Sequence, residues 1–310
     1  MCALYEERGV VVGRDQVLLT ASTSEAYSYL LMALCDPGDE ILVPEPSYPL
    51  FEHLARLAGV HVVRYRLAYD GAWYVDFASL RAGLSERTRA IFVVSPNNPT
   101  GSYLKPAELT ELSTFGVPLV IDEVFRPYAW PSFHGAVAEP LEAPRVLTCV
   151  LDGLSKRIGA PELKLGWAVV AGPGAEECLR RLEYVADTFL SVAGPVQRAL
   201  PDLLSVGRGA QRVLVARVGA NLATLRRKTA ASPVSVLHGE GGWYATLRLP
   251  RVHGEQAWLQ MLTTRDELFA HPGWLFDFHD GPLLVVSLIV AEDLFEEALE
   301  RLVERVRSEC

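Results

Sequence analysis

The sequence is poor in lysine, cysteine and methionine. Its 29 basic residues include only four lysines, Lys105, Lys156, Lys164 and Lys228, so arginine carries nearly all of the positive charge. The five cysteines are odd in number, scattered, and without the spacing of a metal site. They therefore argue against a disulfide framework and a bound metal, and they favour a reducing compartment such as the cytoplasm.

Long apolar runs and clusters of positive charge are also absent. No hydrophobic run reaches about 18 residues, which a transmembrane helix needs, and the first residues lack the layout of a signal peptide. The net charge is −9, and no basic run interleaves with aromatic residues, which argues against nucleic acid as a partner. A chain of 310 residues, half of them hydrophobic, is instead typical of one large or two modest globular domains.

Two of the four lysines lie eight residues apart in one segment, residues 152–167. This segment follows the apolar run Val146–Val150 and overlaps the start of a second one, Leu165–Val170, so we expect a loop between two buried strands. Lysine can lose its proton and bond covalently to carbonyl groups, which arginine cannot do. The pattern predicts either a functional loop with a reactive amine or a solvated loop whose lysines bind nothing.

Polar residues follow two other predicted strands. Asn98 lies in the turn Ser95–Gly101 after the apolar run Ala90–Val94, and Asp122 follows the apolar residues Leu119–Ile121. Ligands of open α/β sheets bind at the carboxyl ends of strands, so both residues and the lysine loop fall on the edge where a ligand would lie. A carboxylate directly after buried residues needs a partner, either a ligand or the backbone of the next turn.

In this order and spacing, Asn98, Asp122 and Lys156 resemble the class I/II aminotransferases, which are fold type I enzymes that use pyridoxal phosphate (PLP). Asp122 lies 24 residues after Asn98, and Lys156 lies 34 residues after Asp122. The resemblance covers nearly the whole chain, from residue 4 to about residue 306. It also implies that the family's usual amino-terminal segment is missing before this sequence.

The resemblance implies an α/β architecture. Helices would sandwich a mostly parallel, seven-stranded sheet in a large PLP-binding domain, residues 1–222. A smaller α+β domain, residues 223–310, would follow. The family forms homodimers with active sites at the subunit interface, so a homodimer is expected.

The sequence pattern of the carboxyl-terminal third agrees with a smaller α+β domain there. Two helices are predicted at Gln197–Leu204 and Val206–Arg227. Strands are predicted at Val234–His238, Trp243–Leu249 and Leu283–Leu288. Together with helices predicted around Glu255–Leu262 and at Glu292–Val306, these strands are typical of an α+β unit that begins at about Pro233.

The resemblance also implies roles for single residues. Lys156 would form a Schiff base with PLP and then move a proton as general base and acid, while Asp122 would keep the pyridine nitrogen protonated. Asn98 would donate a hydrogen bond to the phenolic oxygen of PLP. Tyr48 would stack on the PLP ring, unless it is a rim aromatic that packs against neighbouring prolines.

The phosphate group of PLP would be held by Ser22, Thr23, Ser24 and Lys164. The start of a helix attracts phosphate through its free N–H groups and its dipole. Ser22 and Glu25 also form the pattern of an ordinary capping box, which is the alternative. The family usually has glycine in place of Ser22 and arginine in place of Lys164. At Lys164 a single ammonium group therefore replaces a guanidinium group that can donate two parallel hydrogen bonds.

Two further departures from the family concern Phe125 and Val285. Phe125 occupies the place of a tyrosine that usually also donates to the phenolic oxygen, so we expect the lysine-bound cofactor to titrate at a higher pH. Val285 takes the place of the arginine that binds the α-carboxylate of the substrate. Arg248, and less directly Arg126, are candidates to bind this carboxylate instead; the alternative is that both are surface arginines.

Together these residues predict a PLP-dependent transaminase that moves an amino group between an amino acid and a 2-oxo acid. Another PLP reaction on the same scaffold, such as β-elimination or decarboxylation, would need the same lysine. A non-catalytic or degenerate PLP-binding homologue would fit the departure at Val285. Sequence alone leaves these alternatives open.

Overall fold

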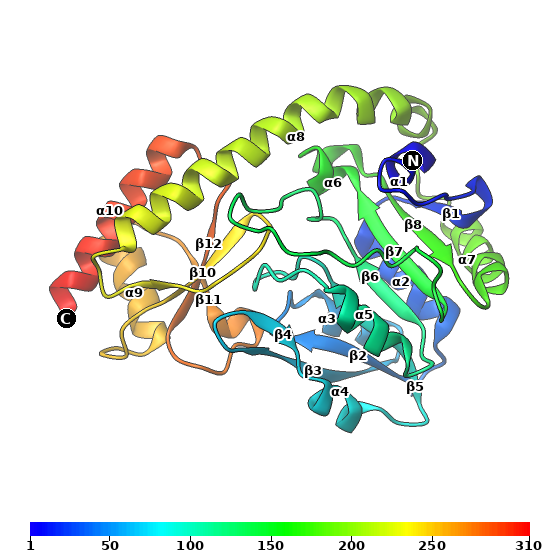
Figure 1. The fold of residues 1–310 in the computed structure, drawn as a ribbon, viewed down its shortest axis with the longest axis horizontal. Coiled ribbons are helices and arrows are strands. Elements are labelled where there is room, and N and C mark those ends of the chain that lie inside the picture. Colours follow the sequence, from blue (N-terminus) through cyan, green and yellow to red (C-terminus); the bar gives the residue numbers. More distant parts are fainter.

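The fold contains a large eight-stranded sheet and a small four-stranded sheet (Figure 1). The computed structural model describes residues 1–310. In the large sheet the strands lie in the order β1 (Val17–Thr20), β8 (Gly166–Ala171), β7 (Thr148–Gly153), β6 (Leu119–Asp122), β5 (Thr88–Val94), β2 (Glu40–Glu45), β3 (His61–Tyr69) and β4 (Trp73–Val75).

The large sheet is mixed and mostly parallel. Strands β3, β2, β5, β6 and β7 run parallel, whereas β8, β1 and β4 pair antiparallel with their neighbours. The predicted mostly parallel α/β sheet is therefore confirmed. It has eight strands instead of the seven expected, because the chain turns at Asp70–Gly71 and the short β4 folds back on β3.

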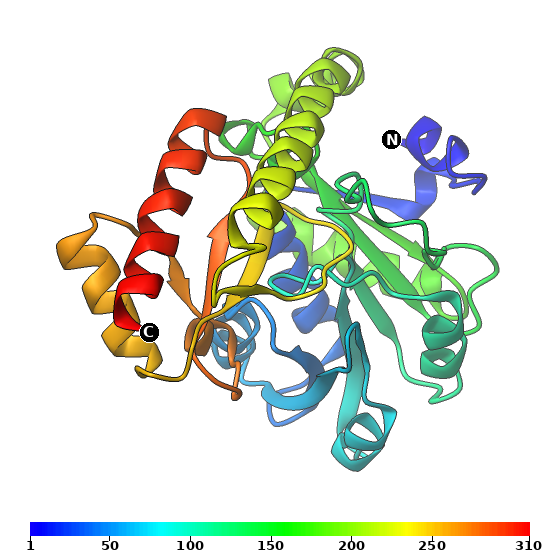
Figure 2. The same cartoon turned by 60° about the vertical axis from the view of Figure 1, so that its left-hand side comes forward.

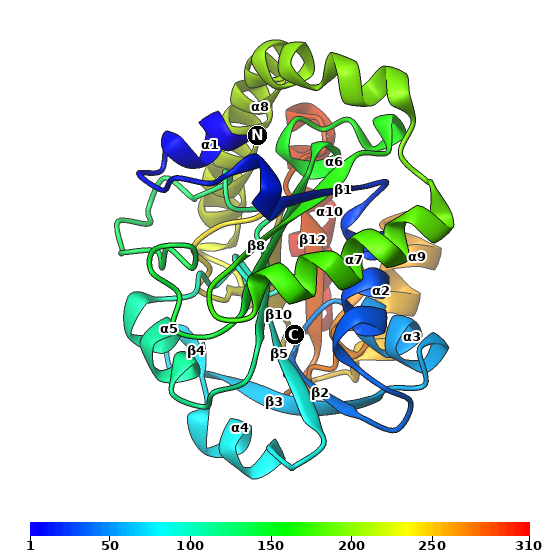
Figure 3. The ribbon, with the colours of Figure 1, turned by 90° about the vertical axis from the view of Figure 1, so that its right-hand side faces the viewer.

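Helices cover both faces of the large sheet (Figure 3). Its central strands are accordingly buried on both sides, and β6, β7 and β8 are buried at every position. One face packs against α2 (Thr23–Leu34), α3 (Leu50–Leu57) and α7 (Ala175–Phe189). The other packs against α1 (Cys2–Glu6), α4 (Phe77–Gly83), α5 (Pro106–Ser113) and α6 (Leu154–Arg157).

The long helix α8 (Gly194–Thr229) connects the two sheets (Figure 1). Leu200, near its start, packs on the large sheet, whereas Leu222 and Leu225 pack on the small one. The sequence predicted two helices separated at Ser205, and the structure shows one helix that continues through this residue. The predicted domain boundary after residue 222 falls inside α8, and the division into two domains stays a prediction.

The small sheet is antiparallel, as is typical of the α+β unit that the sequence predicted. Its strands lie in the order β11 (His271–Pro272), β12 (Leu283–Ser287), β10 (Tyr244–Arg248) and β9 (Ser235–Val236). Helices α9 (Glu255–Arg265) and α10 (Glu292–Glu309) pack on one side of this sheet with the end of α8 (Figure 2). Single-turn helices η1 (Arg14–Gln16), η2 (Pro161–Leu163) and η3 (Gly273–Phe276) complete the fold.

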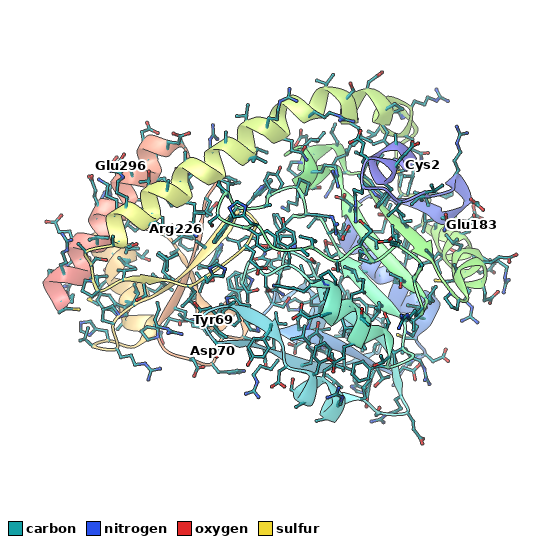
Figure 4. The ribbon with its side chains drawn as sticks, in the orientation of Figure 1. Cys2, Tyr69, Asp70, Glu183, Arg226 and Glu296 are labelled. Carbon is teal, nitrogen blue, oxygen red and sulfur yellow. The ribbon has the colours of Figure 1, made fainter.

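The opposite side of the small sheet faces the large one. Tyr69, at the end of β3, lies next to the small sheet, and its hydroxyl oxygen accepts a hydrogen bond from the His238 N–H at 3.1 Å (Figure 4). Val285 of β12 likewise packs with Val124 and Phe125, which follow β6. Side chains of the small sheet therefore border the carboxyl ends of the large-sheet strands. Among the helices of the chain, none is long and apolar enough to cross a membrane.

Candidate active site

One cavity lies at the carboxyl ends of β5, β6 and β7. It measures about 250 Å³, and Asn98, Asp122 and Lys156 all line it. Parallel strands end at the same edge of a sheet, which is why motifs 24 and 34 residues apart converge here. The complete lining is Thr23, Ser24, Tyr27, Tyr48, Leu50, Phe51, Val94, Asn98, Asp122, Val124, Phe125 and Lys156.

Lys156 projects from the short helix α6, directly after β7. Burial lowers the pKa of its ammonium group, while the charge of Asp122 acts in the opposite direction. Its Nζ lies 5.7 Å from the centre of the Trp243 ring, and the Tyr128 hydroxyl donates to the Lys156 carbonyl oxygen at 2.7 Å. A lowered pKa increases the share of neutral amine, which is the nucleophilic form of lysine.

Asp122 is the last residue of β6 and is almost fully buried. Burial raises the pKa of its carboxyl group to about 6, although hydrogen bonds from the Val124 N–H and the Tyr27 hydroxyl lower it. The folded chain therefore holds this proton more tightly than the unfolded chain does. The resulting contribution to stability is largest below the ordinary pKa of 3.8 and is lost as the pH rises through about 6.

The first turn of α2 lies at another wall of the cavity, through Thr23 and Ser24. Ser22 is the cap of this helix, and its Oγ accepts a hydrogen bond from the Glu25 N–H at 3.1 Å. The Glu25 carboxylate accepts in turn from the Ala21 N–H at 2.6 Å. The side chain of Ser22 thus caps the helix, whereas Thr23 and Ser24 face the space where an anion would bind.

Strand β8 packs directly against this turn at Gly166. A Cβ atom on Gly166 would lie 3.0 Å from the Ser22 carbonyl carbon and 3.1 Å from the Thr23 nitrogen. Gly166→Ala is therefore expected to push the first turn of α2 outward and to weaken PLP binding several-fold, at a cost of about 1–3 kcal/mol in stability. Quenching of protein fluorescence by added PLP measures the affinity.

Gly209→Ala is the matched control for this substitution. Gly209 lies in α8, and a Cβ atom there would meet no other atom within 4 Å. Alanine is the better helix former, so stability should be equal or higher and PLP affinity unchanged. Equal affinities of Gly166→Ala and wild type would contradict the expected displacement of the turn.

Of three other predicted site residues, two line the cavity and one lies outside it. Tyr48 lines the cavity with its ring half exposed, as a stacking partner for a flat ligand would be. Phe125 also lines it and packs edge-on against Trp243 and Tyr244, with ring centres 5.5 and 5.2 Å away. Lys164 is exposed after η2 in a left-handed backbone conformation, and it is not among the lining residues.

The two arginines proposed for the substrate carboxylate lie outside this cavity. Arg248, at the end of β10, lines a separate cavity of about 400 Å³ together with Arg66, Asp277 and Asp280. Val285 lies instead in the buried apolar cluster that contains Val124 and Phe125, two residues of the cavity lining. The structure does not bring Arg248 to Lys156.

Arg126 is engaged elsewhere. Its guanidinium group forms ion pairs with Glu123 and with Glu139, and it donates to the Ala138 carbonyl oxygen at 2.9 Å. Arg8 contacts the same two carboxylates, at 2.7 Å to Glu123 and 2.8 Å to Glu139. These contacts form an ionic network beside the strand end that carries Asp122.

Comparison with known proteins agrees with this arrangement. The sequence profile of the family described as "Aminotransferase class I and II" matches residues 1–302. The chain belongs to this aminotransferase family. The resemblance drawn from Asn98, Asp122 and Lys156 is therefore confirmed, and the aminotransferases of this family use PLP.

Individual aminotransferases match over different lengths. The glutamate-pyruvate aminotransferase AlaA of Haemophilus influenzae is 24% identical over 96% of this chain and 77% of its own length. The alanine aminotransferase of Mycobacterium bovis is 32% identical over 60% of this chain and 44% of its own length. The chain thus spans from less than half to about three quarters of these relatives.

Solved structures show the same fold. The alanine aminotransferase of Pyrococcus furiosus superposes with a TM-score of 0.89 at 24% identity, over 98% of this chain and 79% of the other. The Escherichia coli protein YbdL, described with a methionine aminotransferase function, superposes with a TM-score of 0.85 at 25% identity, over 97% of this chain and 81% of its own. Both matches agree with the mostly parallel large sheet and the small antiparallel sheet.

The residues that line the cavity fit PLP in their chemistry. An amine and a buried carboxylate line the same cavity, as an aldehyde group and a pyridinium nitrogen require. Thr23 and Ser24 bring the first turn of α2 to the cavity, and a helix start favours an anion such as a phosphate group. A flat aromatic side chain, Tyr48, completes the set.

Sequence reasoning missed Tyr27, Trp243 and Tyr128, which contact the predicted residues directly. Tyr27 donates to Asp122, Trp243 lies near the Lys156 amine, and Tyr128 donates to the Lys156 backbone. Only Tyr27 left a signal in the sequence, since it follows Thr23 by four residues on a predicted helix. The other two contacts depend on tertiary packing alone.

Proposed function

We propose that the protein is a PLP-dependent aminotransferase that transfers an amino group between an amino acid and a 2-oxo acid. The observation that carries the proposal is that Lys156 and Asp122 line one cavity, in which burial lowers the pKa of the amine. A homodimer in the cytoplasm is the expected working form, as the family resemblance and the unpaired cysteines suggest.

Each polar residue of the cavity has a separate task in this proposal. Bound PLP supplies an electron sink for the bond that breaks at the substrate α-carbon. Lys156 would hold the cofactor covalently through Nζ, and its amine would take and return the α-proton of the substrate. Asp122 would hold a proton on the ring nitrogen by its negative charge. Asn98 would donate a hydrogen bond to the phenolic oxygen.

The remaining walls position the cofactor and exclude water. Thr23 and Ser24 present the start of α2 to the phosphate group, where backbone N–H groups and the helix dipole favour an anion. Val124, Phe125 and Phe51 make the rest of the lining apolar. An apolar wall strengthens the charge interactions between Lys156, Asp122 and the ligand.

The direct test follows the visible absorption band that PLP gains on a lysine. Purified protein is mixed with PLP and then with single amino acids, starting with glutamate and alanine because relatives are named for them. A transaminase loses the band as its cofactor becomes the amine form, and pyruvate restores it. A band that no donor changes would indicate a non-catalytic homologue. Product formation with the band retained would indicate a lyase or decarboxylase.

Phe125→Tyr restores the tyrosine that the family usually has at this position of the cavity wall. The added hydroxyl offers a hydrogen bond to the phenolic oxygen of the cofactor and stabilises its ionised form. The pH midpoint of the visible band is expected to fall by roughly one unit, which corresponds to one hydrogen bond of about 1.4 kcal/mol. Absorbance titrations of the two proteins measure the difference.

Phe269→Tyr is the control, because Phe269 is 78% exposed and lies outside the cavity. Its titration curve should coincide with that of the wild type. If the curve of Phe125→Tyr coincides as well, the hydroxyl does not reach the phenolic oxygen and the stated reason is wrong.

A further inference from the structure

Asp122 receives a hydrogen bond from Tyr27, a residue outside the sequence motifs. Tyr27 lies on α2, and its hydroxyl donates to Asp122 Oδ2 at 2.7 Å, although 95 residues separate the two in the chain. Both side chains are buried, with exposed fractions of 3% for Tyr27 and 8% for Asp122. A hydrogen bond to an ionised partner is about twice as strong as a neutral one. The contact can therefore influence whether the Asp122 carboxyl group is ionised.

Aromatic neighbours hold the Tyr27 ring in place. Phe92 of β5 stacks on it with ring centres 5.7 Å apart, and Phe51 of α3 meets it edge-on at 5.3 Å. Protein interiors are close-packed, so the ring cannot turn away without moving these neighbours. The hydroxyl of Tyr27 is thus fixed relative to the strand end that carries Asp122.

The two oxygens of Asp122 are shared between two donors. Oδ1 accepts from the Val124 N–H at 3.0 Å, and Oδ2 accepts from Tyr27. Both hydrogen bonds lower the pKa of Asp122 against the larger effect of burial. Two donors on one carboxylate favour its ionised form and also define the direction in which its free lone pairs point.

Other charged groups also face Asp122. The ammonium group of Lys156 favours ionisation of Asp122, whereas Asp152 and Glu123 oppose it. Tyr244 of β10 is a buried phenol within range of its charge. Burial, and then the charge of Asp122, raise the pKa of Tyr27 well above its ordinary value, so Tyr27 keeps its proton and remains a donor.

We propose that Tyr27 is a positioning residue that keeps the Asp122 carboxylate ionised and directed at the ring nitrogen of bound PLP. The inference rests on the proposed function, because it takes PLP as the ligand. Tyr27 follows Thr23 by one helical turn, so α2 connects the phosphate end of the cavity with its carboxylate end. Removal of the hydroxyl should act on the ring nitrogen and leave the phosphate turn intact.

The test compares two ligands on the variant Tyr27→Phe, which loses the hydroxyl and keeps the packed ring. One ligand is PLP, and the other is 1-deazapyridoxal phosphate, in which a carbon atom replaces the ring nitrogen. The Kd for PLP is expected to rise about tenfold, the effect of one hydrogen bond to a charged group. The Kd for the deaza ligand should not change, because this ligand has no nitrogen for Asp122 to meet.

Two outcomes would overturn the inference. Equal losses of affinity for both ligands would make Tyr27 a packing residue only, and no loss for either ligand would show that the hydroxyl has no role. Tyr27→Met, which fills the same space without a ring, should give the same contrast as Tyr27→Phe. It carries the test if Tyr27→Phe does not fold.

Tyr65→Phe is the matched control. Tyr65 is 1% exposed, and its hydroxyl donates to the Phe92 carbonyl oxygen at 2.8 Å, so this variant also loses a buried hydroxyl but none at Asp122. Its Kd values for PLP and for the deaza ligand should equal those of the wild type. Wild-type protein that fails to bind PLP would refute the proposed function itself. Wild-type protein that binds PLP, beside a Tyr27→Phe variant without the ligand contrast, would refute this inference alone.

Discussion

Lys156→Ala is expected to abolish the visible band formed with PLP and to lower the rate of amino transfer by about 10⁴-fold or more. The substitution removes the amine that holds the cofactor and also the base that moves the α-proton. Folding should be retained, because the Lys156 side chain makes no ion pair and is only partly buried. Absorbance spectra and single-turnover rates with an amino donor measure both effects.

Lys228→Ala is the control for this variant. Lys228 lies at the end of α8, where its ammonium group pairs with Glu296 and Glu300 of α10 on the surface. The visible band and the rate should equal those of the wild type. If Lys156→Ala keeps a band of wild-type position and strength, another amine holds the cofactor and the assignment of Lys156 is wrong.

Arg157→Met is expected to give the largest loss of stability among the substitutions considered, a free energy of unfolding lower by about 3 kcal/mol. Asp152 is 1% exposed, and it accepts hydrogen bonds from Arg157 Nε at 2.8 Å and from the Gly153 N–H at 2.7 Å. Without the guanidinium group the carboxylate stays buried with one backbone donor. Urea unfolding followed by circular dichroism measures the loss.

The loss in free energy of unfolding caused by Arg157→Met should depend on pH. Burial already raises the pKa of Asp152, and Arg157 opposes that rise. Removal of Arg157 raises this pKa further, so the folded variant binds a proton more tightly than the unfolded chain does. Its stability relative to wild type should improve as the pH is lowered and worsen as it is raised.

Two comparisons make this prediction specific. Arg180→Met removes an arginine whose pair with Glu177 is exposed to solvent, and such pairs contribute little. Arg157→Met combined with Asp152→Asn removes the buried charge together with its partner and should recover much of the loss. A pH-independent deficit in the single variant would show that lost packing, and not an unpaired carboxylate, is the cause.

The strands and helices near the cavity were largely predictable because their patterns are local. The predicted strand Ala90–Val94 lies within β5, and Leu165–Val170 corresponds to β8 within one residue at each end. Strands buried on both faces read as continuous apolar runs, which sequence shows directly. The continuous α8 was not predicted: the two predicted helices left Ser205 between them, although the first already contained Pro201.

Parts of the predicted site were also visible in the sequence. Asn98, Asp122 and Lys156 each follow a buried strand, and strands of a parallel sheet end at one edge, so their convergence could be expected. Lys164 was assigned from resemblance, and Arg248 was a candidate to replace the arginine that is missing at Val285. The structure leaves Lys164 exposed and directs Arg248 to a separate cavity.

The sequence by itself determined the family and singled out Lys156 as the lysine proposed to react, because both depend on residue types and on spacing along the chain. Only the tertiary structure decided which side chains meet. Tyr27 reaches Asp122 across 95 residues, Val285 packs in one cluster with Phe125, and Arg126 pairs with Glu123 and Glu139. Such contacts arise when distant elements pack together, and no local pattern of the chain encodes them.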